Sequence, residues 1–241
     1  MKKQKEEGRH PFLATLLDGS DASWESIEPR ILVCGFERFG PYPENSTQLL
    51  AESIEGKQIG EHKIFTMIFP PTIPEEDRGM AAFEKARAID ALGIVCLGMG
   101  SEKPGLCIET ATFNRIDNAT YCPPELNGSS IRTDRPRHEG LSLDINRWNI
   151  QAFRKKAAQE GITTALSIDP GGYCCNHLMY QMRLAQEFHM NRDTPWIYIH
   201  VPCSPECIPK PLGGFKKKGK VFLPIKTLER GLALLLENAS L

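Results

Sequence analysis

Short apolar runs alternate with longer amphipathic segments along most of this chain, and this alternation constrains the fold more than any other feature. Short apolar runs bounded by glycine or proline favour buried strands, and apolar stripes at helical spacing favour helices. Strands that alternate with helices are typical of a sheet covered on both faces. We therefore predict a three-layer α/β/α sandwich with a mostly parallel, mixed central sheet. The predicted strands are 31–34, 63–69, 93–97, 164–168 and 196–201, and the predicted helices begin near 45 and 74 and cover 144–159, 176–188 and 223–238.

The length and composition predict one domain. A chain of 241 residues with 41% hydrophobic content can bury one substantial core. Residues 1–28 are charged and aperiodic, so we expect a flexible N-terminal extension, followed by a single α/β domain over 29–241. Residues 118–140 are rich in Pro, Asn, Ser and Arg and lack periodicity, which predicts an active-site flap or a mobile excursion.

Charge and hydropathy argue against several classes of partner. The 29 basic and 30 acidic residues give a net charge of −1, which does not favour a nucleic-acid or membrane-surface protein. No apolar run approaches the roughly 20 residues of a membrane span, and no signal region follows the charged start. We therefore expect a cytoplasmic protein. The eight cysteines are too sparse for a disulfide scaffold, so most are interpreted as buried free thiols.

The highest density of reactive and polar side chains lies in residues 171–177, Gly-Gly-Tyr-Cys-Cys-Asn-His. Here Cys175 is expected at a helix N-terminus, where the helix dipole stabilises a thiolate. His200 ends the apolar run 196–201 and could accept the thiol proton. Both residues fall at the carboxyl ends of predicted strands, where ligands of parallel sheets bind. The pattern predicts a thiol hydrolase in which the first amides of the helix hold the oxyanion.

Four segments resemble one known family. These are residues 35–40, 105–114, 171–177 and 199–202, and the chain is identified from them as a divergent member of the pyroglutamyl-peptidase I (pyrrolidone-carboxylate peptidase) family of cysteine peptidases. The resemblance covers about 30–236. It implies an α/β/α sandwich, removal of an N-terminal pyroglutamyl (5-oxoproline) residue from peptides, no metal or cofactor, and a homo-oligomer, either tetramer or dimer.

The resemblance also implies a triad. It places the nucleophile on Cys175, the base on His200 and the acid that orients the imidazole on Glu109. Glu109 lies in an apolar run, where a carboxylate without a partner is costly, and an imidazolium is a suitable partner. We expect Cys175 to form a thioester with the pyroglutamyl group and His200 to protonate the leaving amine.

The same resemblance implies a substrate pocket. Phe36 and Phe39 match an aromatic pair that sandwiches the pyrrolidone ring, and Asn45 matches a polar residue nearby. Met99, also expected in the pocket, stands where many members have glutamine, so a side-chain contact is lost while backbone contacts persist. Ala119 stands where many members have arginine.

Two further features concern the departures from the family pattern. Arg115 is a candidate substitute for the arginine missing at 119, and the insert around 121–137 looks longer than usual. These changes bear on substrate choice and rate rather than on the triad.

Three alternatives stay open from the sequence. One is a thiol hydrolase of the same fold that acts on another small acyl or amide substrate, and another is a degenerate homologue that binds peptides without turnover. The third is a metal-binding module, but the spacing 203–207 is a lone C-x3-C and no C-x2-C pair exists, so no metal site is predicted. The candidate ligands for that module are Cys174, Cys175, His177, Cys203 and Cys207.

Overall fold

The central element is a seven-stranded sheet. The computed structural model describes residues 28–74, 76–188, 194–208 and 221–241, so the extension predicted over 1–28 lies almost wholly outside the described residues. A separate two-stranded antiparallel sheet pairs β6 (Ala111–Phe113) with β7 (Gly140–Ser142). The order across the large sheet is β2 (Gln58–Ile59), β3 (His62–Phe69), β1 (Arg30–Phe36), β4 (Ala91–Met99), β9 (Trp196–Val201), β5 (Leu106–Glu109) and β8 (Thr164–Ser167).

Strand directions confirm the mostly parallel, mixed sheet. Strands β3, β1, β4 and β9 run parallel, whereas β2 is antiparallel to β3. β5 runs antiparallel to β9 with Cys107 opposite His200, and β8 runs parallel to β5. The carboxyl ends of β5 and β8 therefore point away from the carboxyl end of β9. His200 lies near the carboxyl end of β9, as expected, and Phe36 and Met99 end the parallel strands β1 and β4. The same expectation for Cys175 was wrong, because β8, which precedes it, runs the other way.

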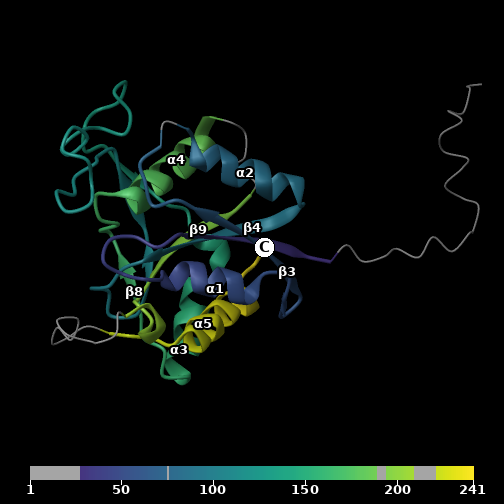
Figure 1. Ribbon diagram of the computed structural model, residues 1–241. Coiled ribbons are helices and arrows are strands. Elements are labelled where there is room, and N and C mark those ends of the chain that lie inside the picture. Colours follow the sequence, from purple (N-terminus) through teal and green to yellow (C-terminus); the bar gives the residue numbers. More distant parts are fainter. Residues whose placement is uncertain (1–27, 75, 189–193, 209–220) are drawn as a thin grey trace, which may run out of the picture.

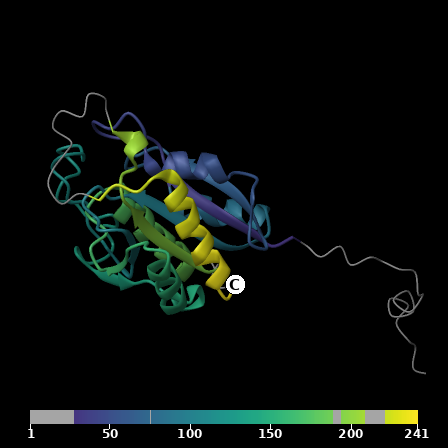
Figure 2. The ribbon, with the colours of Figure 1, turned by 90° about the horizontal axis from the view of Figure 1, so that it is seen from below.

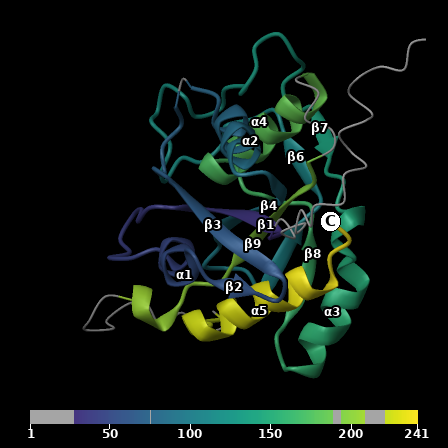
Figure 3. The same cartoon turned by 90° about the vertical axis from the view of Figure 1, so that its right-hand side faces the viewer.

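Helices cover both faces of the sheet, as predicted (Figure 1). On one face lie α1 (Ser46–Ile54), α3 (Ile150–Gln159) and α5 (Ile225–Asn238), and α5 crosses this face in Figure 2. On the other lie α2 (Arg78–Ala88) and α4 (Cys174–Phe188), which Figure 3 shows together above the sheet. Alternate strand residues point to opposite faces, so each apolar strand feeds two cores.

Local signals explain where helices begin. The side chain of Asn45 accepts from the Thr47 amide and caps α1, and Asp77 caps α2 in the same way. The helix predicted over 144–159 is divided into a short 3-10 turn and α3, because Asn149 between them has a left-handed φ of 43°. Helix α4 begins two residues before the predicted start, which places Cys175 in its first turn.

The excursion 118–140 is organised by one buried amide. The Asn114 side chain donates to the carbonyls of Arg132, Arg135 and Pro136, and it accepts from the Arg132 amide. These bonds fix the far part of the excursion beside β6. Within the described ranges, none of the helices combines the length and hydropathy needed to cross a bilayer.

Candidate active site

Cys175 is positioned by the turn before α4 and by an asparagine just after it. Gly171 has a left-handed φ of 77°, and a side chain on Gly172 would collide with the Asp117 carbonyl, so both positions need glycine. The buried Asn176 side chain bonds to the backbone of Phe113 and thereby anchors the helix start to β6. Cys175 is partly exposed, whereas the other seven cysteines are buried.

His200 and Glu109 meet on the sheet face that α4 covers. Nδ1 of His200 lies 2.7 Å from Oε1 of Glu109, and the two side chains are 5% and 0% exposed. Gly98 on the neighbouring strand leaves room for Cys175 to approach His200. An ideal Cβ there would lie only 3.0 Å from the Cys175 sulfur and 3.0 Å from Cδ2 of His200. The three predicted triad residues therefore converge, although they come from antiparallel strands and a helix.

The electrostatics favour a thiolate beside an imidazolium. A hydrogen bond from Cys174 is the largest effect that lowers the pKa of Cys175 well below its usual value, and His200 acts in the same direction against burial. Burial would lower the pKa of His200, but the Cys175 thiolate and Glu109 raise it to about 9. Burial also acts to raise the pKa of Glu109, yet hydrogen bonds led by that of His200 lower it overall.

Lys103 was not predicted from the sequence, yet it binds the carboxylate of Glu109. Its Nζ lies 2.9 Å from Oε1 of Glu109, the same oxygen that faces His200. It also donates to the Ser167 hydroxyl and to the Asp169 carbonyl, at 2.9 and 2.8 Å. Lys103 thus joins the buried carboxylate to the segment that leads into the glycine turn. A lysine near an acid is too common in sequence to reveal this contact.

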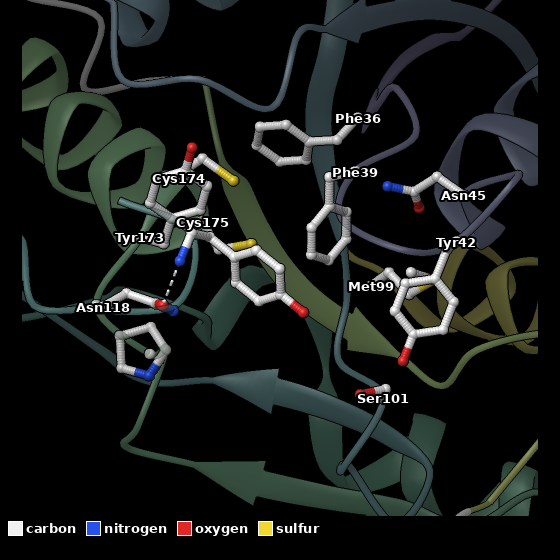
Figure 4. Close-up of a pocket in the computed structure, with 14 residues that line it drawn as sticks. Phe36, Phe39, Tyr42, Asn45, Met99, Ser101, Asn118, Tyr173, Cys174 and Cys175 are labelled. Carbon is white, nitrogen blue, oxygen red and sulfur yellow. Dashed lines mark hydrogen bonds between the residues drawn. The ribbon is translucent and has the colours of Figure 1, made fainter. Parts of the chain in front are cut away.

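A pocket of about 180 Å³ opens beside Cys175 (Figure 4). It contains all four residues predicted to bind substrate together with the nucleophile. Half of its lining residues are aromatic or glycine, which suits a small flat ligand. The lining residues are Phe36, Phe39, Tyr42, Asn45, Met99, Ser101, Asn118, Tyr121, Pro170, Gly171, Gly172, Tyr173, Cys174 and Cys175.

The predicted pocket residues differ in what they offer a ligand. Phe36 is 2% exposed, so it forms the floor, while Phe39 packs against Tyr121 with ring centroids 5.4 Å apart. The Asn45 side chain donates to the Glu37 carbonyl and accepts from the amide and the hydroxyl of Thr47. Asn45 therefore shapes the loop, and its polar atoms are largely committed.

Met99 faces the pocket from the end of β4. It is 6% exposed, and its sulfur accepts a hydrogen bond from the Ser46 hydroxyl at 3.5 Å. A thioether offers a ligand an apolar surface and only a weak acceptor. The wall at Met99 thus recognises shape rather than a specific donor.

Three tyrosines in the pocket wall were not predicted. Tyr42 contacts Phe39 at a centroid distance of 6.1 Å, and Tyr121 contacts Tyr173 at 6.3 Å. Tyr121 belongs to the excursion 118–140, so that segment does border the site, as expected of a flap. No spacing in the sequence links these residues, because they come from three separate loops.

Arg115 does not take the place of the arginine that is missing at 119. Its guanidinium lies over the Phe113 ring at 5.1 Å and 3.7 Å from the Asp169 carboxylate. It is not part of the pocket wall, and Ala119 is exposed. The pocket thus contains no arginine side chain within the described part of the chain.

The candidate metal ligands fall into two groups in the structure. Cys203 and Cys207 pack with Met99 in one buried cluster, and Cys174 packs in the core beneath α4. No three His, Cys, Asp or Glu side chains of the described residues are grouped as a metal ion requires.

Comparison with known proteins gives consistent matches along the chain. The family model described as pyroglutamyl peptidase matches residues 29–239. A pyrrolidone-carboxylate peptidase of Bacillus mycoides is 27% identical over 211 residues, which are 87% of this chain and 92% of the relative. Similar peptidases of Bacillus cereus are 27% identical over 208 residues.

Solved structures share the fold. The pyroglutamyl peptidase I of Bacillus amyloliquefaciens superposes with a TM-score of 0.72 at 21% identity, covering 89% of this chain and 96% of that one. The pyrrolidone carboxyl peptidase of Thermococcus litoralis gives a TM-score of 0.69 at 20% identity, covering 88% and 93%.

Proposed function

This chain belongs to the pyroglutamyl peptidase family, and we propose that it removes an N-terminal pyroglutamyl residue from peptides with Cys175 as nucleophile. The observation that carries the proposal is the convergence of Cys175, His200 and Glu109, with Cys175 also lining a pocket of about 180 Å³. Because that pocket is small and aromatic, it suits one lactam ring rather than an extended peptide.

The geometry supports a two-step reaction, in which a thioester forms on Cys175 and is then hydrolysed. Because Nδ1 of His200 bonds to Glu109, Nε2 is the nitrogen left to serve Cys175. The Cys175 thiolate attacks the carbonyl carbon between the pyroglutamyl group and the next residue, and the carbonyl oxygen gains the negative charge. His200 donates its proton to the departing amine as the carbon–nitrogen bond breaks, leaving a thioester. Water then attacks the thioester, His200 takes a proton from that water, and pyroglutamate and the thiolate separate.

The first turn of α4 is suited to hold the oxyanion. A helix leaves its first backbone N–H groups without intrahelical acceptors, and the positive end of its dipole favours an anion. The first helical bond here runs from the His177 amide to the Tyr173 carbonyl, so the amides of Cys174 and Cys175 precede it. Both lie beside the reacting sulfur.

Selectivity for substrates with an N-terminal pyroglutamyl group tests the proposed function directly. We expect the protein to release aminomethylcoumarin from its pyroglutamyl conjugate and to leave the alanyl and prolyl conjugates at least about 100-fold less reactive, because an unmatched polar group in a closed site is costly. The prolyl conjugate is the matched control, since its ring has the same size but lacks the lactam carbonyl. Equal turnover of the prolyl conjugate would favour the broader thiol hydrolase, and binding of pyroglutamyl peptides without turnover would favour the degenerate homologue.

Activity should depend on pH with two limbs. Below the lowered pKa of Cys175 the thiolate is lost, so kcat/KM should rise with pH from the acid side. Above the pKa of His200, about 9, the general acid is lost, so kcat/KM should fall again. A pH profile of kcat/KM on the pyroglutamyl conjugate checks both limbs. A rate that keeps rising through pH 10 would contradict the ion pair.

The cytoplasmic location and the homo-oligomeric state stay predictions. The oligomeric state follows from the family resemblance, and sedimentation of the purified protein would measure it.

A further inference from the structure

One polar group beneath the nucleophile has no role in the mechanism described so far. The side chain of Tyr198 on β9 is 0% exposed, and its hydroxyl makes no well-aligned hydrogen bond among the described residues. A buried hydroxyl without a partner destabilises a fold, so such a group in a native structure calls for an explanation.

The Tyr198 hydroxyl points at the reaction centre. An ideal Cβ built on Gly98 would touch three groups, namely the Tyr198 hydroxyl, the Cys175 sulfur at 3.0 Å and Cδ2 of His200 at 3.0 Å. The three groups therefore surround one bare strand position. The Tyr198 ring also packs against the His200 ring with centroids 5.2 Å apart. Tyr198 thus lies under both members of the ion pair.

We propose that Tyr198 is a further catalytic residue, whose hydroxyl donates a hydrogen bond to the Cys175 thiolate. This proposal rests on the proposed nucleophile. A thiolate accepts more strongly than a thiol, so the orphan hydroxyl gains its partner when the proton leaves sulfur. The site is enclosed by the sheet and α4, and there a donor aimed at an anion acts without screening by water.

Among the described residues, the Cys175 thiolate is the strongest acceptor that faces this hydroxyl. The titratable groups that face Tyr198 are Cys175 and Cys174 from α4 and Cys96 from β4, with His200 beside it on its own strand. Burial is the main cause of the raised pKa of Tyr198, so the phenol stays protonated and able to donate. Cys174 and Cys96 have raised pKa values, so they remain thiols.

Tyr198→Phe tests the proposal by removing one oxygen atom. We expect the acid limb of the pH profile for Cys175 alkylation by iodoacetamide to move up by about one pH unit, since a hydrogen bond to a charged group is worth that much. At a pH below the acid limb, where the sulfur is a thiol, the melting temperature should stay equal or rise, because no satisfied bond is lost there. Alkylation needs no substrate, so this readout stands even if pyroglutamyl turnover fails.

The matched control is Tyr180→Phe on α4. That side chain is also 0% exposed, but its hydroxyl donates to the Glu139 carboxylate at 2.7 Å. This variant should lose thermal stability and keep the wild-type acid limb. An acid limb in Tyr198→Phe that coincides with wild type would overturn the proposal.

A second measurement keeps the proposal testable if Tyr198→Phe does not fold. Donation to a thiolate shifts the near-ultraviolet absorption of the tyrosine to longer wavelength. The difference spectrum of wild type minus Cys175→Ala should show this shift, with the same pH midpoint as alkylation. A difference spectrum without a tyrosine signal would overturn the proposal.

Discussion

Cys175→Ala should lower kcat for the pyroglutamyl conjugate by at least about 10⁴-fold, because removal of a covalent nucleophile leaves only binding and the oxyanion site. The fold should survive. Cys175 is small and partly exposed, so its truncation leaves no closed cavity, and loss of its pairing with His200 should change the free energy of unfolding by only about 1 kcal/mol. Initial rates and thermal melting on the same preparation measure the two effects.

Cys34→Ala is the control for this change. Cys34 is 1% exposed in the core beneath α2 and α4 and is not part of the pocket wall. Loss of a buried sulfur should cost about 1 kcal/mol or more of stability and leave kcat near wild type. The two cysteines should thus give opposite results. Activity retained in Cys175→Ala would assign the nucleophile elsewhere.

Glu109→Gln should lower kcat by roughly 100- to 1,000-fold, since the imidazolium loses the anion that stabilises and orients it. Glutamine keeps the shape and an acceptor oxygen for His200 and Lys103. The charge is lost, however, so the pKa of His200 should fall below about 9. The alkaline limb of the kcat/KM profile should therefore move to lower pH.

Lys103→Met provides the opposite perturbation at the same carboxylate. Lys103 lies 2.9 Å from Glu109, so its loss removes a cation that competes with the imidazolium for Oε1. The alkaline limb should then move to higher pH, even if kcat falls. Shifts of both variants in one direction would show that the limb does not report the His200–Glu109 pair.

Much of the element order could be predicted from the sequence because it depends on local patterns, whereas the strands β2, β5, β6 and β7 were not predicted. Apolar alternation and capping residues such as Asn45 act within a few residues, and the predicted strands and helices agree with the structure apart from end shifts and the break at Asn149. Strand direction could not be predicted this way. Nothing within residues 106–109 indicates that this strand inserts antiparallel beside β9, yet that insertion brings Glu109 to His200.

The site was predicted only where motifs are contiguous or the family resemblance supplies a role. Cys175 has a glycine turn and a helix start beside it in the sequence. Lys103, Tyr121 and Tyr198 have no such local signature, since each acts through a contact between distant segments. Asn45 shows the reverse case, because its position was predicted while its polar atoms proved to be used within the loop.

The central claim is a thioester on Cys175, and trapping it is the most direct test. The protein is mixed with excess pyroglutamyl conjugate, quenched in acid within the first turnovers and measured as intact mass and as peptides. The account predicts one added pyroglutamyl acyl group per chain, located on Cys175 and absent from Cys175→Ala. Release of pyroglutamate with the acyl group on another residue, or with Cys175 never acylated, would contradict it.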